Sequence, residues 1–197
     1  MARNHSPILK RCRTLGLEPA SLGYAKKPSN RQIATPRKRS EYALQLREKQ
    51  KLKFIYGVLE KQFHTLYERS AKMQGMTGEN MLRLLEQRLD NVVFRLGFAR
   101  TRPEARQFVQ HGHMLVNGKK VDIPSFEVKQ GDVIEISPKS RGSIHVKEVL
   151  DYTQSYARPQ WLSFDKEQMK ATIAQLPARE DVEYPIEERL VVELYSK

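Results

Sequence analysis

The sequence has one cysteine, few aromatic residues and no long apolar run, and each shortage excludes a class of protein. A single cysteine, Cys12, cannot form an internal disulfide framework or a multi-cysteine metal site, so a reducing compartment fits best. No stretch approaches the roughly 18 apolar residues of a membrane helix, and the first residues lack the apolar core of a signal peptide. We therefore expect a protein with no membrane partner.

Acidic residues are scarce at the start of the chain. Residues 1–40 contain ten basic residues and one acidic residue, whereas residues 151–197 carry a net charge of −3. The whole chain of 197 residues carries a net charge of +12. A basic arm and a basic middle favour a polyanionic partner, and the obvious one is nucleic acid.

Composition and periodicity divide the chain into four segments. Residues 1–40 are interrupted by proline and glycine and contain one aromatic residue, Tyr24, so we expect an extended basic arm that orders on a partner. Residues 41–87 predict a helical domain and residues 88–150 a small RNA-binding domain. Residues 151–197 are expected to pack back on the helical domain. The predicted fold class is α+β, with two helices of the RNA-binding domain packed on a short, mostly antiparallel sheet.

Apolar spacing predicts the helices. Residues 40–72 form one amphipathic stretch, which Gly57 is expected to bend or divide. A second apolar face runs over residues 82–96, and Gly97 can end it. Residues 101–104 read Thr-Arg-Pro-Glu, which matches a capping box at the start of a further short helix.

From His113 the apolar period changes from helical spacing to alternation. Two short runs flank Asn117-Gly118, a strong signal for a β-hairpin. We expect further strands at residues 131–136 and 144–149, a short helix at 165–175 and a final strand-like segment at 189–195.

Metal binding is not expected. His5 and Cys12 are too few ligands for a structural zinc ion, which takes four. His111 and His113 are two residues apart but have no carboxylate or thiol partner in register. We expect no metal and no cofactor.

One motif invites an enzymatic interpretation. Arg88-Leu89-Asp90 is similar to the motif of pseudouridine synthases in which the aspartate is the nucleophile. Here Asp90 lies between core positions of an amphipathic helix, and too little chain follows residue 150 to form a catalytic domain. We therefore expect no enzyme and no small-molecule substrate, and keep an RNA-modifying enzyme as an alternative.

Arginines are concentrated on the two predicted helices, and lysines follow at the hairpin. Guanidinium groups held on short helices can grip phosphates bidentately and stack on bases. Aromatic residues are too sparse for base-by-base reading of a single strand. This pattern favours a protein that reads the shape and phosphates of folded RNA.

The segment RLDNVVFRLGFARTRPEARQFVQHGHMLVNGKKVDIPSFEVKQGDVI, residues 88–134, closely resembles the RNA-binding module of small-subunit ribosomal protein S4. Three further segments agree with the bacterial and organellar members of that family: SEYALQLREKQKLKFIYGVLEKQF, TGENMLRLLEQ, and the C-terminal WLSFDK with LPAREDVEYPIEERLVVELYSK. The resemblance covers residues 40–197 and the initial Met-Ala-Arg.

The resemblance implies a structural constituent of the small ribosomal subunit in the cytoplasm, or in an organelle. Family members bind the five-prime domain of small-subunit rRNA early in assembly. They line the channel through which mRNA enters, beside ribosomal proteins three and five, and influence decoding accuracy. Many repress translation of their own messenger.

Charge and the resemblance together predict the following RNA-binding residues: Arg3, Lys10, Arg11, Arg13, Arg37, Lys38, Arg39, Arg47, Lys49, Lys51, Lys53, Arg88, Arg95, Arg100, Arg102, Arg106, His111, His113, Lys119 and Lys120.

The arm departs from the pattern of many family members, which have a cysteine-rich zinc knuckle or a proline-glycine stretch there. With Cys12 alone, the chain resembles the zinc-free branch. A second alternative is a free-standing stress or quality-control factor that carries the same RNA-binding module and acts on stalled ribosomal particles.

Overall fold

The computed structural model describes residues 7–26, 40–166 and 168–196. The chain divides into two compact units. The helical unit comprises residues 1–82 and 183–197, and the sheet unit comprises residues 83–182. The fold class is α+β, as predicted. Within the described residues, no helix is long and apolar enough to cross a membrane.

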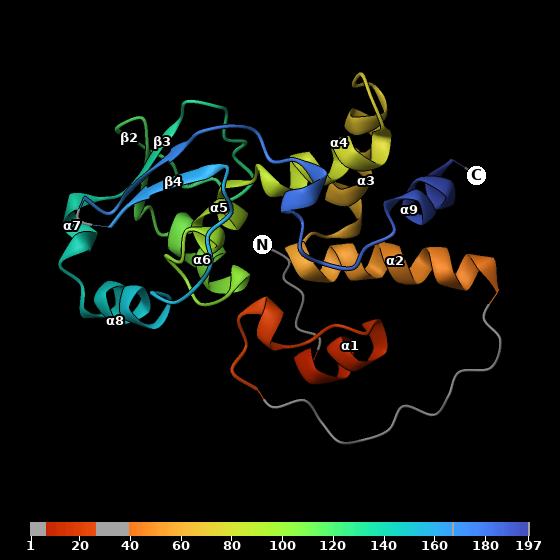
Figure 1. The fold of residues 1–197 in the computed structure, drawn as a ribbon, viewed down its shortest axis with the longest axis horizontal. Helices are drawn as coiled ribbons and strands as arrows, with labels where there is room; N and C mark the ends of the chain where they lie inside the picture. Colours follow the sequence, from red (N-terminus) through yellow and green to blue (C-terminus); the bar gives the residue numbers. More distant parts are fainter. Residues whose placement is uncertain (1–6, 27–39, 167, 197) are drawn as a thin grey trace. The chain divides into compact units, whose positions relative to one another are not determined.

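Glycine divides the long predicted helix of the helical unit. α2 (Glu41–Tyr56) begins at Ser40, whose hydroxyl accepts a hydrogen bond from the Ala43 N–H at 3.4 Å. It ends at Gly57, which has a φ of +63° that favours glycine. α3 (Glu60–Ala71) and α4 (Thr77–Glu86) follow, and α9 (Glu188–Tyr195) packs alongside α2 (Figure 1).

The arm is not extended over its described part, which corrects our expectation for residues 7–26. α1 (Ile8–Leu15) and a short 3-10 turn (Ala20–Leu22) occupy this segment, and α1 packs on α2. Cys12 and Leu15 are buried at helical spacing, and Gly16 ends the helix with a φ of +70°. The Pro and Gly content suggested an extended chain, but these residues lie between helical turns and at their ends.

The sheet unit contains one antiparallel sheet with the strand order β2-β1-β3-β5-β4. Its strands are β1 (Met114–Val116), β2 (Lys119–Lys120), β3 (Val133–Ile136), β4 (Leu162–Asp165) and β5 (Lys170–Ile173). Asn117 and Gly118 have φ values of 51° and 76°, so the turn between β1 and β2 needs the residue types that the sequence supplies. The predicted hairpin is therefore confirmed.

Helices pack against this sheet around a core that includes the fully buried Trp161. They are α5 (Leu89–Arg95), α6 (Arg102–Gln110) and α8 (Ile144–Tyr152). The short α7 (Pro138–Arg141) follows β3 and has no buried residue, and a 3-10 turn (Arg179–Asp181) follows β5. The Thr101 hydroxyl accepts from the Glu104 N–H at 3.3 Å and caps α6, as the sequence indicates. The Glu104 carboxylate accepts from the Arg100 N–H at 2.6 Å.

The predicted helix over residues 82–96 is two helices. α4 ends at Glu86 and α5 begins at Leu89, because the backbone between them pairs with a distant loop. The Leu89 N–H donates to the Phe126 carbonyl at 2.8 Å, and the Val128 N–H donates to the Gln87 carbonyl at 2.9 Å. This pairing places Arg88 in extended backbone at the start of α5.

Three predictions in the last third of the chain are wrong. Residues 144–149 lie in α8, where Val146, Val149 and Leu150 are buried at helical spacing. Residues 165–175 contain the turn and second strand of the β4–β5 hairpin instead of a helix. Residues 189–195 are helical, in α9.

The division at residue 151 is corrected as well. β5 pairs with β3, with Ile134 opposite Ala171, so residues 151–182 belong to the sheet unit. Only residues 183–197 pack back on the helical unit. There, Lys51 Nζ donates to the Pro185 carbonyl at 2.8 Å and Gln45 Nε2 donates to Glu193 Oε2 at 3.2 Å.

Candidate nucleic-acid interface

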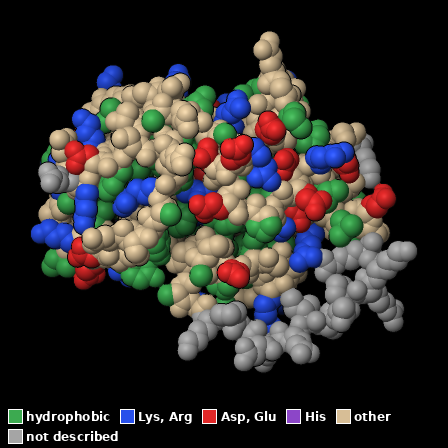
Figure 2. Space-filling view, in the orientation of Figure 1, with side chains coloured by type: hydrophobic (Ala, Val, Ile, Leu, Met, Phe, Trp, Pro, Cys, Tyr) green, Lys and Arg blue, Asp and Glu red, His purple; other side chains and the backbone are tan. Residues whose placement is uncertain are grey.

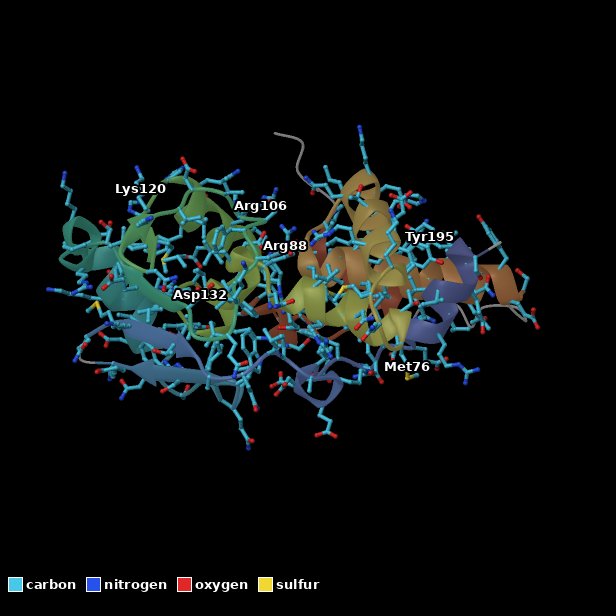
Figure 3. The ribbon with its side chains drawn as sticks, turned by 90° about the horizontal axis from the view of Figure 1, so that it is seen from above. Met76, Arg88, Arg106, Lys120, Asp132 and Tyr195 are labelled. Carbon is cyan, nitrogen blue, oxygen red and sulfur yellow. The ribbon has the colours of Figure 1, made fainter. Side chains whose placement is uncertain are left out.

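Basic side chains reach the surface of the sheet unit from α6 and the β1–β2 hairpin. Lys119 and Lys120 are exposed on β2, and His111 is exposed just after α6. Arg106 is half-buried on α6. Figure 3 shows Arg106 and Lys120 on the same side of the unit. Figure 2 shows Lys and Arg side chains, with fewer acidic ones, scattered among other side chains over the face drawn at the left.

Asp90 connects Arg106 to the interior. The Asp90 carboxylate accepts two hydrogen bonds from Arg88, at 3.1 and 2.8 Å, and lies 3.4 Å from Arg106 Nη1. Arg88 and Asp90 are both buried, whereas the Arg106 side chain is 18% exposed. Arg106 is therefore held by a carboxylate while part of its side chain faces solvent.

A second buried carboxylate holds the other end of the two helices. Glu86 accepts from Asn91 Nδ2 at 2.6 Å and from Arg95 Nη2 at 3.0 Å. Asn91 Oδ1 in turn accepts from Arg102 Nε at 2.8 Å, and the Arg102 guanidinium lies 4.3 Å from the Phe94 ring centroid. Buried charges of this kind are tolerated because they are paired and hydrogen-bonded.

These networks correct the expectation for Arg88, Arg95 and Arg102. The sequence predicts that their guanidinium groups contact RNA, but all three side chains are buried and interact with Asp90, Glu86 or Asn91. The bond from Arg102 to Asn91 joins α6 to α5, and the bond from Arg95 to Glu86 joins α5 to the end of α4. The surface side chains from the same region are Arg100, which is half-buried at the turn before α6, and Arg106.

The hairpin and the end of α6 are fixed by close packing. The aliphatic chain of Lys120 crosses Gly112 so closely that a Cβ added to Gly112 would overlap Lys120 Cε. Asn117 Oδ1 accepts from the Val133 N–H at 2.9 Å, and Asn117 Nδ2 donates to Asp132 Oδ1 at 2.8 Å. The lysines at the hairpin therefore extend from a rigid support.

The His113 ring packs between side chains of α6 and α7. It stacks on Phe108 with 4.7 Å between ring centroids, and its Nδ1 lies 2.8 Å from Ser140 Oγ. Burial lowers the pKa of His113, and the positive charges of His111, Lys120 and His145 lower it further. The lowered pKa favours the uncharged form of His113, and His111 is the more exposed of the two predicted histidines.

The predicted lysines of α2 differ in their surroundings. Lys49 and Lys53 both pair with Glu60, at 2.8 and 2.5 Å, near the surface. Burial by itself would raise the pKa of Glu60, but hydrogen bonds from Lys49, Lys53 and Tyr195 lower it to about 2. The expectation that Lys51 contacts RNA is corrected, because its side chain is buried between Glu48 and the Pro185 carbonyl.

The remaining predicted residues that the structure describes lie on or near α1. Lys10 is exposed, and Arg11 and Arg13 are half-buried on this helix. Arg47 of α2 approaches the end of α1, with its Nη2 3.1 Å from the position that a Cβ on Gly16 would take. Four predicted residues lie outside the described part of the chain: Arg3, Arg37, Lys38 and Arg39.

Two family models match successive segments of the chain. The model of the ribosomal protein S4/S9 N-terminal domain matches residues 3–86, and the S4 domain model matches residues 87–134. The small ribosomal subunit protein uS4 of Lachnospira eligens is 55% identical over all of both chains, and that of Agathobacter rectalis is 53% identical over all of both chains. The chain belongs to the ribosomal protein S4 family.

The S4 family consists of structural ribosomal proteins, so the expectation that the chain is not an enzyme is confirmed. The geometry of Asp90 agrees. Its carboxylate is buried and accepts hydrogen bonds from Arg88, from Arg106 and from the Asn91 N–H at 2.9 Å. Among the described residues, no group of three or more His, Cys, Asp or Glu side chains could hold a metal ion.

The sequence pattern does not single out the polar residues that hold the basic elements of the sheet unit in place. Glu86, Asn91 and Asn117 each accept or donate the hydrogen bonds that hold a basic helix or hairpin in place. Asn91 directly follows Asp90 and looks like an ordinary position on a helix surface. The signal in the sequence that could have identified Asn91 is its place between Leu89 and Val92, two positions of the apolar helix face.

Proposed function

We propose that the chain is a structural protein of the small ribosomal subunit in the cytoplasm and that it binds rRNA through the basic side of its sheet unit. This proposal is supported by full-length similarity to proteins named small ribosomal subunit protein uS4. The residues of this side that reach the surface are Arg100, Arg106, His111, Lys119 and Lys120. They extend from elements that buried ion pairs and tight turns fix in place.

The fixed positions of the basic side chains support binding to folded RNA. Because the Asp90 carboxylate holds Arg106, this arginine has less side-chain entropy to lose when a phosphate binds. We extend the proposal to the five-prime domain of small-subunit rRNA and to a role in nucleating its assembly. By family resemblance, it includes neighbouring ribosomal proteins three and five, the channel for mRNA, decoding accuracy and repression of the chain's own messenger.

A salt titration tests the proposal. The full chain is bound to five-prime-domain RNA with bulk transfer RNA as competitor, and the affinity is measured against salt concentration. About six phosphate contacts would give a log-log slope of about −4 to −5. Binding that survives the competitor supports a specific assembly protein. Binding that the competitor abolishes would contradict it and favour a free-standing factor, which would associate with ribosomes only under some conditions.

A further inference from the structure

An exposed tyrosine lies beside the one turn that joins the two helices of the proposed interface. Tyr152, in the last turn of α8, is 44% exposed. The Arg100 guanidinium carbon lies 5.0 Å from the centroid of its ring. An exposed tyrosine has an apolar ring face and a polar hydroxyl, so it can contact a ligand that is partly aromatic and partly polar.

Among the described residues, no acidic side chain neutralises the charge of Arg100. Arg88 and Arg95 pair with buried carboxylates, and Arg106 shares Asp90. In contrast, no carboxylate of the described residues pairs with the Arg100 guanidinium, whose Nε also has no hydrogen-bond partner there. The planar guanidinium of Arg100 in this turn and the planar ring of Tyr152 in α8 therefore lie together.

The position of Tyr152 is fixed by its neighbour in the chain. Thr153 is fully buried and donates a hydrogen bond from Oγ1 to the Gly97 carbonyl at 2.6 Å. A Cβ on Gly97 would lie 2.8 Å from Thr153 Oγ1, so the end of α8 fits tightly against the turn after α5. The Tyr156 ring meets the Tyr152 ring edge to face, with 6.0 Å between the ring centroids.

We propose that Arg100 and Tyr152 form a stacking site for one unpaired nucleobase of the bound RNA. This inference rests on the proposed function and adds a contact that depends on a base in addition to the phosphates. An aromatic ring and a guanidinium plane are the two surfaces on which proteins stack splayed-out bases. The unpaired positive charge of Arg100 favours a nucleic acid over an apolar protein surface.

Substitutions of Tyr152 in the full chain test the site with five-prime-domain RNA. Tyr152→Ala is expected to weaken binding by about tenfold or more and to leave the salt slope unchanged, because stacking releases no counterions. Tyr152→Phe is expected to bind like the parent chain. Arg100→Gln is expected to weaken binding and also to reduce the slope by about one.

Matched controls separate stacking on the ring from apolar contact and from loss of the fold. Ile144→Ala removes the most exposed apolar side chain of the same helix, about 12 Å away along its axis, and should leave binding unchanged. Tyr152→Leu keeps an apolar surface but no ring, so parent-like binding by this variant would overturn the proposal in favour of simple apolar contact. Thermal melting of each variant confirms that it is folded.

Photocrosslinking gives a direct readout. Ultraviolet irradiation of the complex should attach a nucleotide to the peptide that contains Tyr152, and Tyr152→Ala should abolish that adduct. Parent-like affinity of Tyr152→Ala, with no adduct in the parent complex, would overturn the stacking site and leave the proposed function intact. Failure of the parent chain itself to bind against competitor would instead overturn the proposed function.

Discussion

Two carboxylates in this chain each hold two basic side chains, one at the surface of the helical unit and one inside the sheet unit. The Glu60 side chain is 50% exposed and pairs with Lys49 and Lys53. The Asp90 side chain is 6% exposed and pairs with Arg88 and Arg106. Each group has one carboxylate and two basic side chains, but the Glu60 carboxylate is exposed to water and the Asp90 carboxylate is buried.

The difference separates two uses of charge in an RNA-binding protein. In water an exposed pair contributes little to stability and can exchange its partner for a phosphate. A buried pair cannot dissociate without leaving an uncompensated charge in a medium of low dielectric constant. We therefore expect the Asp90 pair to fix the shape of the interface, and the Glu60 pair to keep two lysines close to the surface.

The largest expected effect comes from removing the buried charge. Asp90→Asn keeps the size of the side chain but leaves Arg88 buried without a carboxylate, so we expect it to destabilise the sheet unit by about 3–5 kcal/mol. The matched substitution Glu60→Gln should cost at most about 1 kcal/mol. Chemical denaturation of both variants measures the difference. Equal losses would contradict the comparison.

The same experiment addresses the enzymatic alternative. If Asp90 acted as a nucleophile, Asp90→Asn would abolish RNA modification while leaving a stable fold. A large loss of stability without any change in the pseudouridine content of the RNA agrees with a purely structural carboxylate.

A smaller contrast lies between two arginines one helical turn apart. Arg102→Gln leaves Asn91 Oδ1 buried without its donor and should destabilise the chain by about 1–3 kcal/mol. Arg106→Gln leaves the Arg88–Asp90 pair intact and should change stability by less than about 1 kcal/mol. It should weaken RNA binding and reduce the salt slope by about one. Denaturation and salt-dependent binding assays distinguish the two.

In these assays, parent-like affinity of a folded Arg106→Gln variant would remove Arg106 from the proposed interface. A fully stable Arg102→Gln variant would show that the buried network is dispensable.

Local patterns in the sequence predicted those elements whose signals are short. The Asn117-Gly118 hairpin and the Thr101 cap are confirmed because backbone sterics and one hydrogen bond determine them. The β4–β5 hairpin was missed because its strand order depends on β5 pairing with β3, about 35 residues earlier in the chain. The break at Arg88 likewise depends on a loop near Phe126.

The site was predictable as a basic region but not residue by residue. Charge and spacing select arginines on α5 and α6, but a helical period alone does not show which of them a neighbouring element covers. Arg95 lies inside because Glu86, on a different helix, turns toward it. The sequence does not single out Tyr152, because apolar alternation over residues 144–149 predicts a strand that ends before it, whereas these residues lie in α8.

The smallest expected effect concerns the pH and salt dependence of the Glu60 pair. Burial opposes ionisation, but Lys49, Lys53 and Tyr195 lower the pKa of Glu60 in the folded chain to about 2, from an ordinary 4.5. Between these values the unfolded chain binds more protons, so the contribution of Glu60 to stability is complete above about pH 5 and is lost as the pH falls toward 2. Because the side chain is half exposed, the contribution should stay below about 1 kcal/mol.

The stability difference between the parent chain and Glu60→Gln should therefore shrink as the pH is lowered from 6 to 3, and 0.5 M salt at pH 6 should reduce it, since the Debye length there is only about 4 Å. Thermal melting of both proteins across this range measures it. The Asp90 pair should respond much less to salt, because buried pairs are screened less than exposed ones. A Glu60 difference that is insensitive to both pH and salt would mean that packing around Tyr195, where the Tyr67 ring stacks at 4.8 Å, holds α9 in place without help from the charges.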